Sequence, residues 1–231
     1  MQFKIVKESC PSESERVSAI LRDFDMTLCH AREEFEGNID IEGFDWSVGL
    51  IVGASGTGKS TIAREVFGDA YVRGYEYVAE AVVDDMPRHA SVEEIELAFT
   101  SVGFASPPSW LKPYEVLSTG EKMRVDLARA ILSDQDVICF DEFTSVVDRA
   151  TAKTASLALQ KAIRKQGRKF VAVSCHRDIE EWLMPDWIYD TDSKSFFVAG
   201  AMESPFSDLT YTELITGISN GCGTYLGSIT I

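Results

Sequence analysis

The sequence predicts an α/β fold with a mostly parallel central sheet. Two observations carry this prediction. Short apolar runs such as residues 49–53 and 137–140 are typical of parallel strands that are buried on both faces. These runs alternate with segments of helical character, and strands that alternate with helices form parallel sheets. At 231 residues the chain is long enough to bury a sizeable core as one domain.

Local signals place the elements along the chain. Ser91, followed by acidic residues, predicts a helix start, and Pro107, Pro108 and Pro113 predict a non-helical connection after that helix. Residues 25–46 mix short apolar pieces with acids and predict irregular antiparallel strands. The expected strands cover residues 2–6, 49–53, 77–83, 136–140, 170–175, 186–189 and 196–198. The other expected helices cover residues 12–24, 59–67, 119–131 and 149–165.

Composition indicates an acidic globular protein. The chain has 37 Asp and Glu against 22 Lys and Arg, a formal net charge of −15, and 45% hydrophobic residues. This composition excludes wholesale disorder. The sequence pI near 4.6 argues against a uniformly basic nucleic-acid surface and against a polybasic membrane anchor. Because no apolar run is long enough to cross a bilayer, we expect a soluble chain with no membrane insertion.

The cysteines and the first residues predict a cytoplasmic protein. Five cysteines are scattered along the chain without metal-ligand spacing, which favours reduced thiols over a disulfide framework. The opening residues lack the pattern of a secretory signal. Cys139 and Cys175 lie in apolar runs, so we expect both to be small core residues.

A glycine-rich loop lies between a predicted strand and a predicted helix. Residues 53–60 fit the phosphate-binding pattern GxxxxGK[ST]. Glycines let the backbone wrap around an anion, while amide N–H groups and the helix N-terminus point at phosphate oxygens. Lys59 is predicted to contact the terminal phosphates, and Ser60 to coordinate Mg²⁺. The predicted nucleotide-binding residues of this loop are Gly53, Ser55, Gly56, Thr57, Gly58, Lys59, Ser60 and Thr61.

This loop alone leaves kinases, GTPases and several ATPase classes open, and a glycine-rich turn without a ligand is the structural alternative. The second half of the chain narrows the choice. The apolar run 137–140 ends in Asp141 and Glu142, which is a Walker B arrangement. Asp141 is predicted to hold Mg²⁺, and Glu142 to polarise the attacking water. Taken alone, an ordinary strand with an acidic turn would explain these residues better.

Three further motifs surround this strand. Residues 117–122 read LSTGEK, residues 145–148 read SVVD, and the apolar run 171–175 ends at His176. In this order and spacing, the set resembles the signature, D-loop and switch histidine of ABC-class nucleotide-binding domains. The resemblance is specific because five motifs occur in one order.

The resemblance covers about residues 1–198. It implies a P-loop NTPase of ABC type with an N-terminal antiparallel β region and a small helical subdomain at about residues 85–132, followed by an extension at residues 199–231. It also implies a homodimer packed head to tail, with ATP and Mg²⁺ held between the subunits until hydrolysis opens the dimer. One subunit would supply the phosphate loop and Walker B acids, and the other the signature. The implied residues are Lys59, Glu142 and His176 for catalysis, Ser118, Gly120 and Asp148 for further nucleotide contacts, and Ser60 and Asp141 for the metal.

Several departures from the family pattern matter. The usual signature reads LSGGQ, so Thr119 and Glu121 replace its first glycine and its glutamine. No glutamine lies between the phosphate loop and the signature, so the Q-loop residue is missing, and Asp84 or Asp85 is the candidate replacement. That loop normally meets a transporter's membrane partner, which counts against a transporter subunit. Phe35 is a candidate for stacking on adenine, with a core position as the alternative.

The process that ATP drives is a separate question. Residues 110–122, 141–149, 170–178 and 182–187 resemble the ATPase half of predicted proteins that join an ABC-type ATPase to a GNAT N-acetyltransferase domain. This resemblance implies a separate acyltransferase-like partner. A cationic cluster predicts either a helix C-terminus or a local contact with nucleic acid or an acidic partner. Its members are Lys161, Arg164, Lys165, Arg168 and Lys169.

We therefore predict an energy-coupled ATPase switch in nucleic-acid modification or maintenance. Two alternatives remain open. The first is the nucleotide-binding subunit of a membrane transporter, and the second is a nucleotide-gated binding module with little hydrolysis. Multiple-turnover ATPase activity would exclude the second alternative.

Overall fold

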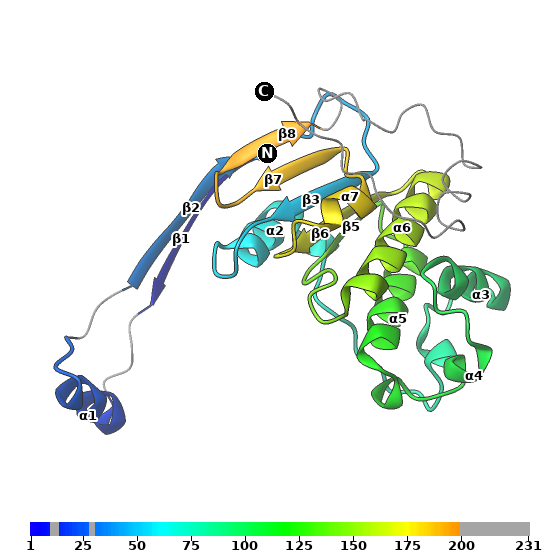
Figure 1. The fold of residues 1–231 in the computed structure, drawn as a ribbon, viewed down its shortest axis with the longest axis horizontal. Coiled ribbons are helices and arrows are strands. Elements are labelled where there is room, and N and C mark those ends of the chain that lie inside the picture. Colours follow the sequence, from blue (N-terminus) through cyan, green and yellow to red (C-terminus); the bar gives the residue numbers. More distant parts are fainter. Residues whose placement is uncertain (10–13, 28–30, 199–231) are drawn as a thin grey trace, which may run out of the picture. The chain divides into compact units, whose positions relative to one another are not determined.

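A six-stranded sheet organises the molecule, with the strand order β4–β5–β6–β3–β7–β8 (Figure 1). The computed structural model describes residues 1–9, 14–27 and 31–198. Parallel pairing joins the first five strands, and β8 is antiparallel to β7. The strands are β3 (Val48–Val52), β4 (Tyr71–Val72), β5 (Val137–Phe140), β6 (Lys169–Ser174), β7 (Trp187–Asp190) and β8 (Ser195–Val198). This mixed, mostly parallel sheet confirms the predicted α/β class.

Helices cover both faces of this sheet (Figure 1). Leu50 of β3 belongs to a core shared with α5 and α6. The neighbouring Ile51 points to the other core, which includes Ile62 of α2 and Trp187 of β7. Burial on both faces explains why these strands read as continuous apolar runs. The helices are α1 (Glu15–Asp23), α2 (Lys59–Phe67), α3 (Val92–Ser101), α4 (Pro107–Trp110), α5 (Thr119–Leu132), α6 (Arg149–Gln166) and α7 (Ile179–Leu183).

A separate two-stranded sheet forms near the N-terminus. The strands β1 (Gln2–Ser9) and β2 (Ala31–Asn38) pair antiparallel, with Ile5 opposite Phe35. Phe3 of β1 is buried in the core that includes Ile51 and α2. The predicted antiparallel region is therefore present, although the predicted strand at residues 2–6 is longer in the structure.

The predicted strand at residues 77–83 is wrong. Instead, the chain ends β4 at Val72 and later forms a short 3₁₀ helix at Val82–Asp85. The backbone N–H groups of Val78 and Ala79 donate to the Asp85 carboxylate at 3.1–3.2 Å, so this turn uses donors that a strand would offer to a neighbour. Val78 is 91% exposed whereas Val82 is fully buried, so the apolar residues of this run are not buried together as those of a core strand would be.

The predicted non-helical connection after α3 is also partly wrong. The helix α4 begins at Pro107, with Pro108 in the next position. Proline is tolerated in the first turn of a helix because the N–H that it lacks has no partner there. Pro113 does lie outside helical structure, before a 3₁₀ turn at Tyr114–Val116. The short α7 has no counterpart in the sequence-based prediction.

The chain can also be described by its structural units and by the length of its helices. Met1–Ala199 belong to one structural unit, and the predicted extension at residues 199–231 lies outside the described residues, as do Cys10, Cys29 and Cys222. None of the helices within the described residues is both long enough and apolar enough to cross a bilayer.

Candidate functional site

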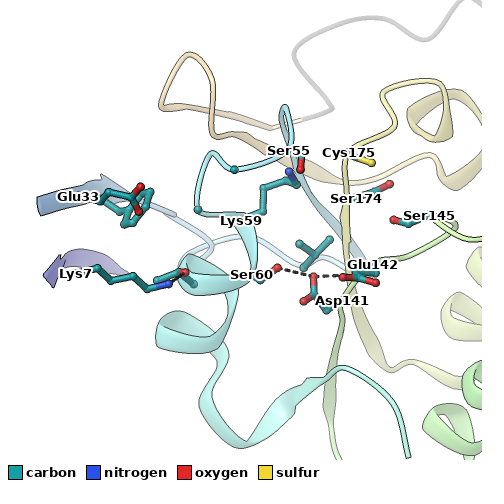
Figure 2. A pocket seen from close by; sticks show the side chains of 15 residues that line it. Lys7, Glu33, Ser55, Lys59, Ser60, Asp141, Glu142, Ser145, Ser174 and Cys175 are labelled. Atoms are coloured by element: carbon teal, nitrogen blue, oxygen red, sulfur yellow. Dashed lines mark hydrogen bonds between the residues drawn. The ribbon is translucent and has the colours of Figure 1, made fainter. Parts of the chain in front are cut away.

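A cavity of about 580 Å³ opens at the carboxyl ends of β3, β5 and β6 (Figure 2). This volume lies within the range of small-molecule sites. The lining comes from the phosphate loop and the start of α2, from the ends of β5 and β6, and from the β1–β2 hairpin. The lining residues are Lys7, Glu33, Phe35, Ser55, Gly56, Gly58, Lys59, Ser60, Thr61, Asp141, Glu142, Ser145, Val173, Ser174 and Cys175.

The phosphate loop is shaped for an anion. Gly58 has φ 86° and precedes α2, and a Cβ added there would lie 2.3 Å from the ring of Phe35, so only glycine fits. The N-terminus of α2 has no side-chain cap, which leaves its first N–H groups available for phosphate oxygens. Lys59 Nζ donates to Ala54 O at 2.6 Å, and a bound phosphate would compete for this ammonium group.

Hydroxyl and carboxylate oxygens lie close together in the cavity that Lys59 also lines. Ser60 Oγ donates to Asp141 Oδ1 at 3.1 Å, and the Tyr71 hydroxyl donates to Asp141 Oδ2. Asp141 is 3% exposed, and burial raises the pKa of Tyr71, helped by the hydrogen bond to Asp141. Hydroxyl and carboxylate oxygens are preferred by Mg²⁺, which commonly uses one or two protein ligands together with substrate phosphates. Ser60 and Asp141 therefore fit the metal predicted for them.

Glu142 lies at the same edge in an unusual backbone conformation. Its φ is 52°, a left-handed value that a non-glycine residue adopts at a cost of roughly 1 kcal/mol and that is common at functional sites. The Glu142 carboxylate is exposed, and Arg73 Nη2 lies 3.7 Å from its Oε1. The backbone conformation and this ion pair present the carboxylate at the edge of the cavity.

Arg73 is a site residue that the sequence-based prediction missed. Neither Asp84 nor Asp85, the predicted replacements for the Q-loop residue, lines the cavity, and the carboxylate of Asp85 instead accepts backbone N–H groups. Arg73 directly follows β4, the strand that pairs with β5. The role of Arg73 could therefore be recognised only from the strand order, which places the ends of β4 and β5 side by side.

The hairpin contributes a wall that the sequence-based prediction largely missed. Phe35 of β2 lines the cavity and packs against both Gly58 and the core around Ile51, so the two readings of this residue are compatible. Lys7 of β1 donates to Thr61 Oγ1 in the first turn of α2. Figure 2 shows Lys7 and Glu33 on one side of the cavity and Ser174 and Cys175 on the other.

The end of β6 corrects one of the two cysteine predictions. Cys139 is fully buried, as predicted, and burial raises the pKa of its thiol. Cys175 is exposed and lines the cavity, because β6 ends one residue earlier, at Ser174. His176 follows directly and is half-buried, but it is not among the lining residues.

The signature residues lie outside this cavity. Ser118 caps α5, and a capping box joins it to Glu121, whose carboxylate accepts the backbone N–H of Ser118 at 2.9 Å. Asp148 caps α6 and accepts hydrogen bonds from the backbone and hydroxyl of Thr151, which lower the pKa of its carboxyl. Neither these two caps nor Gly120 lines the cavity. Within the described chain, these residues therefore lie apart from the lining of the cavity that contains the phosphate loop.

The predicted cationic cluster does not form one free patch. Arg164 pairs with Asp186 at 2.9 Å, and Arg168 donates to two backbone carbonyl groups. Lys169 Nζ lies 5.0 Å from the centre of the Trp46 ring. Arg164, Arg168 and Lys169 thus make contacts within the fold, and a local contact of this cluster with nucleic acid or an acidic partner stays a prediction.

Comparisons with known proteins agree with the predicted class. No family model matches the chain. It is 28% identical over 193 residues to the aliphatic sulfonates import ATP-binding protein SsuB of Rhodopseudomonas palustris, an alignment covering 69% of this chain and 68% of that protein. It is 25% identical over 209 residues to the energy-coupling factor transporter ATP-binding protein EcfA1 of Leuconostoc mesenteroides, covering 74% and 75%.

Two other matches are a partial sequence match and a solved structure. The chain is 31% identical over 99 residues to the macrolide export ATP-binding/permease protein MacB of Rhodospirillum rubrum, covering 43% of this chain and 15% of that protein. A solved structure, the post-hydrolysis dimer of the ATP-binding cassette MJ0796 bound to ADP and Pi, superposes with a TM-score of 0.58 at 15% identity, covering 84% of this chain and 99% of that one. The chain is thus similar in sequence to ATP-binding subunits of ABC transporters and similar in fold to a solved ATP-binding cassette.

Proposed function

We propose that this chain hydrolyses ATP to ADP and phosphate at two composite sites of a homodimer that ATP closes and hydrolysis opens. One observation carries the proposal. Lys59 and Ser60 of the phosphate loop meet the Walker B pair in one cavity, with Ser60 Oγ 3.1 Å from Asp141 Oδ1 and Glu142 next along the chain. These groups are the parts that phosphoryl transfer to water requires.

The proposed role of each residue follows from its position in the site. Lys59 and the N–H groups at the start of α2 bind and orient the terminal phosphates. Ser60 and Asp141 hold Mg²⁺, which when bound neutralises charge on the phosphate oxygens. Glu142 orients the attacking water and accepts its proton. His176 follows the cavity-lining Ser174 and Cys175 and would contact the γ-phosphate once the second subunit closes the site.

A second subunit completes this site. Ser118 and Gly120 begin α5, and a helix N-terminus carries a partial positive charge suited to a phosphate. Because neither residue lines the cavity of its own chain, each would act on the nucleotide of the other subunit. Dimeric cassette structures, one of them bound to ADP and Pi, support this arrangement.

Glu142→Gln tests the proposal. Removing the general base should lower the steady-state ATPase rate by at least about 100-fold and leave an ATP-bound dimer that light scattering detects after size-exclusion chromatography. Lys59→Ala should lose ATP binding in calorimetry and stay monomeric with ATP. An unchanged rate in Glu142→Gln would remove the assigned role of Glu142, and absence of ATP binding by the wild-type chain would remove the function.

For the process that ATP drives, the nucleotide-binding subunit of a transporter is better supported than a nucleic-acid switch. SsuB and EcfA1 are named as transporter ATP-binding proteins. Val82, at the start of the 3₁₀ helix after Val78, also donates its backbone N–H to Lys112 O at 2.9 Å, next to Leu111 in the chain. Val78, Leu111 and Val116 are 91%, 70% and 65% exposed, and such apolar side chains suit a protein partner.

The nucleic-acid switch and its acyltransferase-like partner remain the competing proposal, motivated by the sequence resemblance. Stimulation of the ATPase rate by DNA or RNA, lost in Lys165→Ala, would favour it. Stable capture of a membrane protein by wild type but not by Val78→Asp, with Leu97→Asp of α3 as an exposed apolar control (64% exposed), would favour the transporter subunit.

A further inference from the structure

The turn between β7 and β8 contacts the start of the phosphate loop. The Ala54 backbone N–H donates to both carboxylate oxygens of Asp192, at 3.0 and 3.2 Å. One residue earlier, Thr191 Oγ1 lies 2.6 Å from Thr57 Oγ1, and its backbone N–H donates to Val52 O at 2.9 Å. Two neighbouring residues of this turn therefore hold the loop at its second and fifth residues, Ala54 and Thr57.

The packing between turn and loop is tight. A Cβ added to Gly53 would lie 2.1 Å from Thr191 Oγ1 and 3.3 Å from Asp192 Oδ1. Real Cβ atoms do not approach other atoms this closely, so the first glycine of the phosphate motif is required by this turn as well as by the nucleotide. The loop and the turn form one packed unit, within which a displacement of Asp192 must move Ala54.

Arg177 connects this unit to the end of β6. Its guanidinium donates to Asp190 at 2.8 and 3.1 Å and to Asp192 Oδ2 at 2.7 Å. The hydrogen bonds with Arg177 are the main cause of the lowered pKa of the Asp190 carboxyl. Arg177 directly follows His176, so one side chain joins the segment with the predicted switch histidine to the carboxylate that holds the phosphate loop.

We propose that Asp192 is a positioning residue of the nucleotide site and that Arg177 anchors it; this inference rests on the proposed ATP-binding function. Asp192 fixes the N–H of Ala54, and the carbonyl of the same residue accepts Lys59 Nζ at 2.6 Å. The position of Ala54 therefore determines the position of the Lys59 ammonium group in the nucleotide-free site. Through Arg177 and Asp192, the segment that contains His176 is also connected to the phosphate loop by hydrogen bonds.

Asp192→Ala and Asp192→Asn separate positioning from general stability. Asp192→Ala removes the acceptor for Ala54 N–H, whereas the amide oxygen of Asp192→Asn can still accept it. The matched control is Asp186→Ala. Asp186 makes the same kinds of contact at the other end of β3, accepting the N–H groups of Ser47 and Val48 at 2.7 and 2.8 Å and pairing with Arg164.

Two measurements on the full chain are made well below each variant's Tm. In hydrogen–deuterium exchange of the nucleotide-free protein, Asp192→Ala should speed exchange in the phosphate-loop peptide, and Asp186→Ala should not. In calorimetry with ADP, Asp192→Ala should weaken binding about tenfold, and Asp192→Asn less than about threefold, since a hydrogen bond to a charged acceptor is lost in the first and replaced by a neutral one in the second.

The outcomes distinguish this inference from the proposed function. If wild type binds ADP and Asp192→Ala binds equally well with unchanged loop exchange, the positioning role is overturned while the function stands. If wild type binds neither ADP nor ATP, the proposed function and the role of Asp192 in it fail together. If Asp186→Ala weakens ADP binding as much as Asp192→Ala does, the effect is one of general stability and the proposal is overturned.

Discussion

Arg73 Nη2 lies 3.7 Å from Glu142 Oε1, across the carboxyl ends of the neighbouring strands β4 and β5. The same short strand provides Tyr71, whose hydroxyl donates to Asp141. Each Walker B carboxylate therefore has a partner at the end of β4, Tyr71 in the strand and Arg73 directly after it, although the strand is only two residues long. Arg73 and Tyr71 restrain the acids that are proposed to hold Mg²⁺ and to activate water.

Arg73→Ala should lower the ATPase kcat about fivefold, because an exposed ion pair contributes up to about 1 kcal/mol. The KM for ATP should change less, since Arg73 contacts Glu142 and does not line the phosphate loop. Arg73→Lys should recover part of kcat because it keeps the charge. Steady-state kinetics at one salt concentration measure both constants.

The control for this prediction is Arg32→Ala, which breaks an exposed ion pair with Glu8 (3.9 Å) in the β1–β2 hairpin. Neither Arg32 nor Glu8 lines the cavity, so kcat should stay at the wild-type value. Equal kcat values for wild type and Arg73→Ala would show that Glu142 needs no restraint from β4.

Glu121 places a negative charge where a phosphate is expected to approach. Its carboxylate accepts the Ser118 hydroxyl at 2.8 Å and the Ser109 hydroxyl at 2.9 Å, and the hydrogen bonds from Ser118 lower the pKa of the Glu121 carboxyl. Glu121→Gln keeps one acceptor oxygen at this position and removes the charge. In a Glu142→Gln background, the ATP-bound dimer should therefore tighten at least about threefold, with a weaker dependence on salt.

Analytical ultracentrifugation with ATP measures this change, and the chain offers a matched control. Glu94 forms the same capping box with Ser91 at the start of α3, so Glu94→Gln makes an equivalent change away from Ser118. A dimer constant that shifts equally in both variants, or in neither, would contradict the placement of the partner's phosphate at Ser118 and Gly120.

The sequence-based predictions succeeded where local signals and tertiary structure agree. The helix at Lys59–Phe67 was predicted with its correct bounds because the phosphate motif ends at its first turn. The strand predicted at residues 77–83 was wrong because composition alone does not distinguish a buried strand from a segment with exposed residues such as Val78. Arg73 was missed for a different reason. Its role depends on β4 lying next to β5, a relationship between residues far apart in the chain that no local pattern contains.

Cys175 should be alkylated by N-ethylmaleimide, and nucleotide should protect it. Its side chain is exposed in the cavity with the phosphate loop, so ATP with Mg²⁺ covers it in a Glu142→Gln background. Cys139 should stay unmodified because it is buried and its thiol pKa is raised. Mass spectrometry of the two peptides measures modification. Lys59→Ala should lose the protection, and protection that persists without nucleotide binding would contradict this location of the site.

The last prediction concerns Asp126 of α5, which accepts hydrogen bonds from Tyr77 at 2.7 Å and from Tyr114 at 2.9 Å. Burial raises the pKa of the Asp126 carboxyl above its ordinary value near 3.8, and the two hydroxyl groups oppose that shift. A raised carboxyl pKa means that ionised Asp126 costs stability at neutral pH, and this cost disappears as the pH falls through the raised pKa. The two tyrosines reduce the cost by hydrogen bonding to the ionised form.

Tyr77→Phe removes one of these donors and should lower the free energy of unfolding by about 1–3 kcal/mol at pH 7. The deficit should shrink as the pH falls toward 4.5, because protonated Asp126 needs the donor less. Urea denaturation at both pH values measures it. Tyr75→Phe is the control: its ring lies under Arg129 as the Tyr77 ring does, but the hydroxyl donors to Asp126 are those of Tyr77 and Tyr114, so the deficit of Tyr75→Phe should not depend on pH in this range. An equal deficit for Tyr77→Phe at both pH values would contradict the link to ionised Asp126, because this variant keeps the ring that stacks on Tyr114, 3.9 Å between centroids.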